Sequence, residues 1–102
     1  LFAKEQSMTS TEIYPHITRN ERGEPTITGS RTTVKRIAGY YKLGMNADEI
    51  CDALTHLSPA EVHAALTYYF DYREEIEALL DEERRMLAEL KKEQSFNHLQ
   101  TA

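Results

Sequence analysis

The sequence is poor in residues that cross-link a fold. It has one cysteine, Cys51, among its 102 residues, so no disulfide can form within the chain. No apolar run is long enough to span a bilayer and no secretory signal is recognisable, so we expect a cytoplasmic protein with no membrane partner. The length and the 40% share of hydrophobic residues support a single small domain.

Residue patterns that carry catalysis are also missing. There is no glycine-rich phosphate loop and no nucleophile elbow, and the carboxylates after Asp71 follow helical spacing. The histidines form no i, i+4 pair and have no cysteine nearby; they are His16, His56, His63 and His98. Cys51 fits best as a small apolar residue on the inner face of a helix. We therefore expect neither an enzyme nor a bound metal or cofactor.

Acidic residues outnumber basic ones, but the two kinds are concentrated in different halves of the chain. The net charge is −5. Residues 1–45 hold seven lysines and arginines against four acids, a net charge of +3, and the remainder holds five against thirteen, a net charge of −8. This division suits a protein that binds a polyanion with one end and a basic partner with the other, or simply a solvated acidic helix surface.

Residues 13–34 are typical of short β structure, after an N-terminal tail at 1–12. Isoleucines stand among threonines there and are separated by glycine and proline. The turn of a hairpin is expected at 20–24, where Gly23 can adopt the positive φ of a tight connection. Pro25 would then begin the second strand, because proline has no N–H to donate inside a ladder.

From Thr33 the apolar spacing changes to that of a helix, which Gly44 is placed to end. The apolar stripe consists of Val34, Ile37, Ala38 and Tyr41. Two capping boxes follow at 46–49 and 58–61, each a cap residue with a glutamate three positions later. Pro59 at the first helical position strengthens the second of these signals.

These signals predict a compact unit of three helices. The second helix would run from Ala47 to about Leu54, and the connection at 55–57 has the length found in a helix-turn-helix. The expected core residues are Ile37, Tyr41, Ile50, Leu54, Leu57, Val62 and Leu66. The predicted fold class is mainly α, with a short N-terminal β-hairpin or strands, a trihelical helix-turn-helix core and a C-terminal helix.

A further apolar pattern with helical spacing continues to about Lys92. Because a helix uninterrupted from 59 onward would be unusually long, we expect either a break near 71–73 or a long dimerising helix. We assign 13–77 to the helix-turn-helix domain with its β segment, 78–93 to an acidic C-terminal helix and 94–102 to a disordered tail.

The block GEPTITGSRTTV at 23–34 resembles the opening motif G-x-P-x-I-x-G-T-R-x-x-V of the family catalogued as domain of unknown function number 433. Ser30 stands where that family usually has threonine and keeps the hydroxyl. Further matching positions over 13–77 are Gly44, Asp48, Glu49, Ile50, Leu57, Ser58, Val62, Ala65, Leu66, Tyr68 and Tyr69. The resemblance implies a homeodomain-like, usually dimeric DNA-binding fold, and the antitoxin role in a prokaryotic pair with a PIN-like ribonuclease toxin.

DNA binding requires cations for the phosphates and side chains that reach base edges. We assign these roles to residues of the hairpin, the entry of the first helix and the outer face of the last core helix: Arg19, Arg22, Arg31, Thr32, Lys35, Arg36, His63 and Thr67. The start of that last helix lacks arginine, asparagine and glutamine, which favours weak or partner-assisted binding. For Arg31 the alternative is a local bond to a loop carbonyl or to Asp48 or Glu49.

Aromatic residues exceed what one small core requires, and some of them must belong to that core. The surplus and the late apolar stripe predict a homodimer or partner interface, for which the candidates are Tyr40, Tyr68, Tyr69, Tyr72, Ile76, Leu79, Leu80 and Leu87. The favoured function is a DNA-binding antitoxin that regulates its own operator and neutralises a PIN-like ribonuclease toxin. The alternative is a dimeric protein-interaction module that does not bind DNA.

Overall fold

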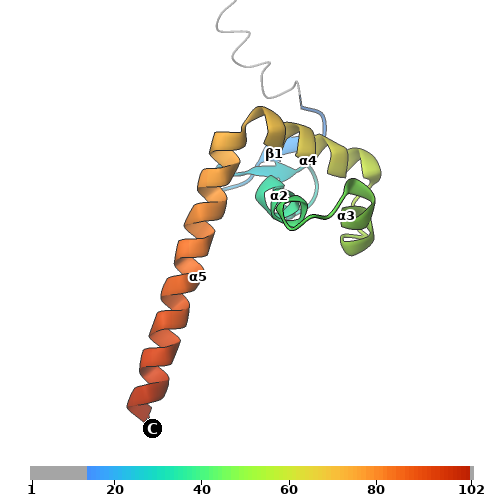
Figure 1. The fold of residues 1–102 in the computed structure, drawn as a ribbon. Helices are drawn as coiled ribbons and strands as arrows, with labels where there is room; N and C mark the ends of the chain where they lie inside the picture. The colour runs from blue at the N-terminus through green and yellow to red at the C-terminus, as the bar shows by residue number, and fades with distance from the viewer. Residues whose placement is uncertain (1–13, 102) are drawn as a thin grey trace, which may run out of the picture.

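The structure, a computed structural model, describes the backbone of residues 14–101 and the side chains of residues 14–94. The tail expected at 1–12 lies outside this range. Two strands and four helices follow one another along the chain: β1 (Ile17–Arg19), β2 (Pro25–Ile27), α2 (Val34–Lys42), α3 (Ala47–Ala53), α4 (Pro59–Asp71) and α5 (Arg73–Thr101). The predicted class, a mainly helical fold with a short N-terminal β-hairpin, is confirmed (Figure 1).

The hairpin forms where the turn residues place it. β1 and β2 are antiparallel, with Ile17 opposite Ile27 and Pro25 at the end of the ladder opposite Arg19. The side-chain oxygen of Asn20 accepts hydrogen bonds from the backbone N–H groups of Arg22 and Glu24, at 2.9 and 3.0 Å. Gly23 has a φ of +79°, a conformation that costs glycine little. The turn chemistry is therefore local and was readable from the sequence.

Helix α2 also begins and ends as expected. Thr33 caps its N-terminus by accepting from the backbone N–H of Arg36, and Gly44, with a φ of +100°, follows its last turn. The prediction of a core position for Tyr41 was wrong, because this side chain is 39% exposed. Its ring lies at the rim of the core, edge-on to Phe70 at a centroid distance of 5.2 Å, so one side remains in solvent.

Both predicted capping boxes are present. The side chain of Asn46 accepts from the backbone N–H of Glu49 at 2.8 Å, and the carboxylate of Glu49 accepts from the N–H of Asn46 at 2.9 Å. Ser58 and Glu61 make the same reciprocal pair at the start of α4. The first box thus starts α3, and the second ends the connection at 54–58 and starts α4.

Replacing Ser58 with alanine should lower the free energy of unfolding by about 1 kcal/mol, because the N–H of Glu61 loses its side-chain acceptor. Urea unfolding followed by circular dichroism measures the difference. Thr55→Ala, at an exposed position in the same connection, is the control and should leave the midpoint almost unchanged. Equal midpoints for the two variants would show that the box contributes nothing.

The core lies where α2, α3 and α4 meet the hairpin and the first turns of α5. Fully buried side chains come from each part, namely Ile27, Val34, Ile37, Ile50, Val62, Tyr69 and Ile76. Figure 1 shows α2 and α3 on one side of α4, with the hairpin beside them and α5 leaving the body as a projecting rod. Among the residues that the structure describes, no helix has the length and apolar content needed to cross a bilayer.

The helical segment is interrupted at Tyr72, which is the first of the two alternatives that the sequence left open. The backbone of Tyr72 has φ −125° and ψ 51°, which ends α4 and lets α5 start at Arg73. Helix α5 therefore begins before the expected 78–93 range, and its backbone continues to Thr101 through positions expected to be disordered. Neither proline nor glycine occurs between 73 and 101, so nothing in the backbone stops the helix.

Candidate functional site

In the first half of the chain, the basic residues that the structure describes divide into paired and unpaired groups. Arg19 forms an ion pair with Glu75 at 2.9 Å, and Lys42 pairs with Glu77. Lys35 lies between Glu24, at 3.5 Å, and Glu83, at 3.7 Å. Three of these four acids, Glu75, Glu77 and Glu83, belong to α5. The acidic part of the chain thus neutralises cations of the basic part within one molecule.

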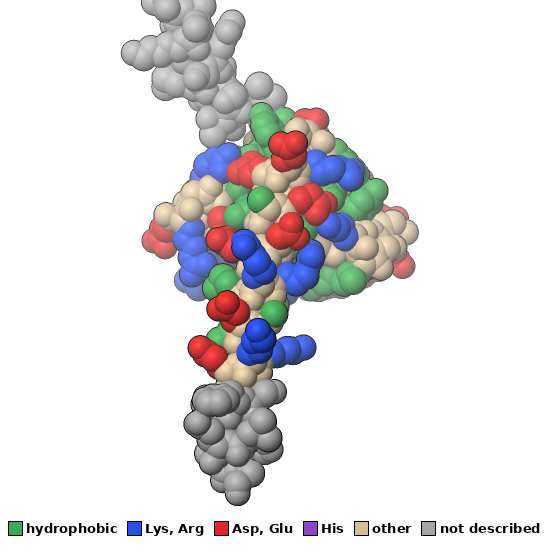
Figure 2. All heavy atoms as spheres, turned by 60° about the vertical axis from the view of Figure 1, so that its left-hand side comes forward, with side chains coloured by type: hydrophobic (Ala, Val, Ile, Leu, Met, Phe, Trp, Pro, Cys, Tyr) green, Lys and Arg blue, Asp and Glu red, His purple; other side chains and the backbone are tan. Residues whose placement is uncertain are grey.

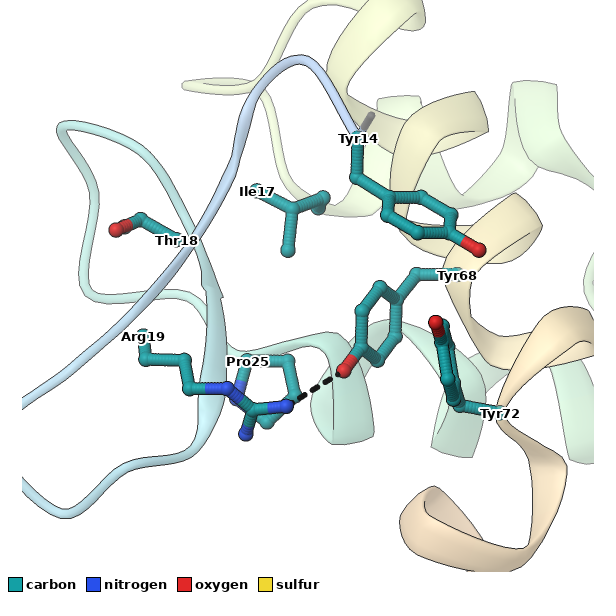
Figure 3. Close-up of a pocket in the computed structure, with 7 residues that line it drawn as sticks. All are labelled: Tyr14, Ile17, Thr18, Arg19, Pro25, Tyr68 and Tyr72. Atoms are coloured by element: carbon teal, nitrogen blue, oxygen red, sulfur yellow. Dashed lines mark hydrogen bonds between the residues drawn. The ribbon is translucent and has the colours of Figure 1, made fainter. Parts of the chain in front are cut away.

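Arg19 was predicted to contact DNA, but in the structure its guanidinium group is bonded to other parts of the fold. Its Nη1 donates to the carbonyl of Gly23 at 2.7 Å as well as to Glu75, and its Nη2 donates to the hydroxyl of Tyr68 at 3.0 Å. Figure 3 shows the guanidinium reaching Tyr68 from the edge of the hairpin, beside Pro25. The arginine therefore ties β1 to α4 and α5.

A small cavity of about 280 Å³ lies next to Arg19. Its lining includes the rings of Tyr14, Tyr68 and Tyr72 (Figure 3). Their centroids are 4.7 to 5.7 Å apart, so the rings pack against one another and leave no room between them for a ligand. These ring contacts join the segment before β1 to the end of α4.

The same contacts shift the ionisation of the groups that make them. Burial and the hydrogen bond to Glu75 raise the pKa of Tyr68 to about 12. The hydrogen bond to Glu75 likewise raises the pKa of the Arg19 guanidinium. Hydrogen bonds donated by Lys42 and Tyr69 lower the pKa of Glu77. The charges at the base of α5 are thus stabilised by partners in the chain.

Arg22, Arg31 and Arg36 form the unpaired group. All three are exposed, and within residues 14–94 no carboxylate lies at ion-pair distance from them. The alternative in which Asp48 or Glu49 holds Arg31 therefore gains no support. Arg22, Arg31 and Lys35 line a hollow beside the hairpin, and Arg31, Lys35 and Arg36 line a second hollow between α2 and α5. Because the two hollows share residues, we call four of the cations that line them, Arg22, Arg31, Lys35 and Arg36, the arginine groove. Arg19 also lines the hollow beside the hairpin, but it is held by Glu75.

Thr32, another predicted DNA contact, is not on this surface. Its side chain is only 4% exposed. The Thr32 hydroxyl lies 2.8 Å from Nε2 of His56 and accepts from the Ser30 hydroxyl at 3.1 Å. The prediction was wrong because the residue faces the α3–α4 connection, where it anchors the loop that carries Arg31. His56, which the sequence left without a role, is the partner that no local pattern could reveal.

His63 and Thr67 are exposed on α4, as predicted, but they line neither hollow of the arginine groove. His63 Nδ1 donates to the carbonyl of Pro59 at 2.8 Å, and the Thr67 hydroxyl donates to the carbonyl of His63 at 2.9 Å. Both side chains thus bond to their own helix. The predicted set is therefore not one site: four of its cations gather in the arginine groove, and the α4 pair stands apart.

The predicted partner interface divides in the same way. Tyr68, Tyr69 and Ile76 are at most 6% exposed, so no partner can reach them, and their assignment to an interface was wrong. Tyr68 is covered by the hairpin and by Tyr14, and Tyr69 and Ile76 lie in the core where α4 and α5 pack against α2. The half-buried members, which pack on the edge of the core, are Tyr40, Leu79 and Leu80, and the exposed ones are Tyr72 and Leu87.

Beyond the body, α5 presents an apolar stripe of Met86, Leu87 and Leu90, exposed at 63, 54 and 52%. The charge around it is not acidic as expected. Residues 73–83 hold six acids and one arginine, a net charge of −5, whereas 84–94 hold four basic residues and two acids, a net charge of +2. Figure 2, which brings α5 to the front, shows both kinds of charge interspersed along it. The acidity of α5 is thus concentrated at its base.

No group of three histidine, cysteine or carboxylate side chains that could hold a metal ion occurs in the part of the chain that the structure describes. No curated protein and no solved structure matches the chain. A sequence model of one family, described as "Protein of unknown function (DUF433)", matches residues 19–69, half of the 102 residues. This segment runs from Arg19 in β1 to Tyr69 in α4 and holds the motif at 23–34. The chain therefore belongs to the DUF433 family.

Proposed function

We propose that this protein is a DNA-binding, antitoxin-like component of a toxin–antitoxin pair, acting in the cytoplasm, with α3 and α4 as its helix-turn-helix. The observation that carries the DNA part is the arginine groove. Among the described cations near the hairpin and α2, Arg22, Arg31 and Arg36 are exposed without an ion-pair partner and line adjoining hollows. Unpaired guanidinium groups so arranged suit successive phosphates of a nucleic acid backbone.

The groove favours contact with the backbone over reading of bases. Arginine guanidinium groups bind the phosphate oxygens of DNA, and such contacts carry no sequence information. The outer face of α4 offers His63 and Thr67, whose polar groups already bond to their own helix. We therefore expect modest discrimination between sequences and a strong dependence on salt.

Changing Arg31 and Arg36 together to alanine should weaken binding to duplex DNA by roughly ten- to hundredfold at low salt, because two phosphate contacts are lost. The slope of log affinity against log salt should also become less steep by about 1.8. Fluorescence anisotropy with a labelled duplex from the promoter upstream of the gene measures both quantities.

The matched control is Arg85→Ala with Lys92→Ala, which removes two positive charges from exposed positions of α5 on the face opposite the apolar stripe. It should bind DNA almost as the wild type does. Equal losses in the two double variants would mean that only total charge matters, and an absence of salt-sensitive binding by the wild type would contradict the DNA role altogether.

The partner half of the proposal depends on the exposed stripe of Met86, Leu87 and Leu90. An apolar stripe on a projecting helix fits burial against another polypeptide. The family resemblance makes a PIN-like ribonuclease, or a second copy of the chain, the first partner to test. If Leu87→Asp leaves DNA binding intact but abolishes co-purification with the product of the adjacent reading frame, the two roles are separate. Partner binding without any DNA binding would instead support the protein-interaction module.

A further inference from the structure

Lys35 belongs to the arginine groove, but unlike the three arginines there it has ion-pair partners. It lies in the first turn of α2 and lines both hollows, together with Arg31. Its ammonium group lies 3.5 Å from Glu24 on the hairpin side and 3.7 Å from Glu83 on α5, and its side chain is only 21% exposed. One cation is thus shared between two carboxylates from different parts of the fold.

The carboxylate of Glu83 faces the space that a phosphate would use. Glu83 lines the hollow between α2 and α5 together with Arg31, Lys35 and Arg36, and half of its side chain is exposed there. A negative charge in that position repels a phosphate and neutralises the cation that would bind it. The Lys35–Glu83 ion pair is weak, because it is long and its carboxylate is half exposed. Lys35 can therefore exchange Glu83 for a phosphate without disturbing the fold.

We propose that Glu83 is a negative regulator of the arginine groove, which keeps Lys35 from contributing to phosphate binding. This inference rests on the proposed DNA binding. Glu83 also interrupts the apolar face of α5 between Leu80 and Met86.

The test compares Glu83→Gln with Glu82→Gln in the full chain, using anisotropy with the same labelled promoter duplex. Both substitutions remove one negative charge from neighbouring exposed positions, but among the described residues Glu82 has no ion-pair partner. We expect E83Q to bind several-fold more tightly than E82Q at low salt. Its salt dependence should be steeper by about 0.9, the contribution of one additional phosphate contact.

Lys35→Gln supplies the second arm of the experiment. In a K35Q background the difference between E83Q and E82Q should vanish, because the cation that Glu83 controls is gone. Equal affinities for E83Q and E82Q in the Lys35 background, or a difference that survives K35Q, would overturn the role of Glu83 while leaving DNA binding in place. If no chain, wild type included, binds the duplex, the failure lies with the DNA proposal itself.

Discussion

Replacing Ile76 with alanine should lower the free energy of unfolding by about 2 to 5 kcal/mol, the usual cost of truncating a fully buried isoleucine. Ile76 lies in the first turns of α5, outside the segment that defines the family, yet it is 0% exposed in the core formed by that segment. The substitution removes apolar contacts and leaves a cavity between α5 and the helices it covers. Urea unfolding followed by circular dichroism gives the change in midpoint and slope.

Leu90→Ala is the matched control, because Leu90 lies on the same helix but is 52% exposed. Its effect should stay within about 0.5 kcal/mol. A stability of I76A close to that of the wild type would mean that the base of α5 is not part of the cooperative core. The expected result means instead that the family segment needs the chain beyond Tyr69 to complete its core.

A loss of stability at alkaline pH is the second large effect. The pKa of Tyr68 is about 12 in the folded protein, against 10.0 for an ordinary tyrosine. The folded chain therefore keeps a proton that the unfolded chain releases, so this contribution is complete below pH 10 and is lost as the pH rises to about 12. At about 1.4 kcal/mol per pH unit, Tyr68 alone accounts for a loss of roughly 2 to 3 kcal/mol.

Urea unfolding between neutral pH and pH 12 tests this expectation. The pKa values of Tyr14 and Tyr69 are raised as well, by the hydrogen bond to Asp71 and by burial respectively, and they add to the decline in the same direction. Tyr68→Phe should lower stability at neutral pH, because Glu75 and Arg19 lose a partner, but should flatten the alkaline decline. Tyr40→Phe, at a half-buried position outside this cluster of tyrosines, is the control. An alkaline decline in Y68F as steep as that of the wild type would contradict the assignment.

The fold brings acidic residues of the second half of the chain next to basic residues of the first half. From the sequence, a basic half and an acidic half suggest two separate binding surfaces. In the structure, Glu75, Glu77 and Glu83 at the base of α5 pair with cations of the first half, and the projecting part of α5 has a slight excess of positive charge. The proposed partner surface is therefore defined by its apolar stripe, and the proposed DNA surface by the arginines that α5 leaves unpaired.

The local structure was determined by the sequence itself. The hairpin turn with Gly23 and the two capping boxes each depend on residues within a few positions of one another. Hydrogen bonds and backbone conformations of this kind are fixed by side chains close in the chain, so their identities suffice to predict them. The fold class and the family motif were therefore readable before any coordinates.

Tertiary structure alone decided which candidate residues remain available to a ligand. Periodicity placed Ile76 and Leu87 on one stripe of α5, but only the folded chain shows that the first is covered and the second is not. Arg19 and Arg31 look alike in the sequence, yet one is held by Glu75 and the other is free of any described carboxylate. The physical reason is that burial and ion pairing join residues far apart in the chain, and no local pattern encodes those contacts.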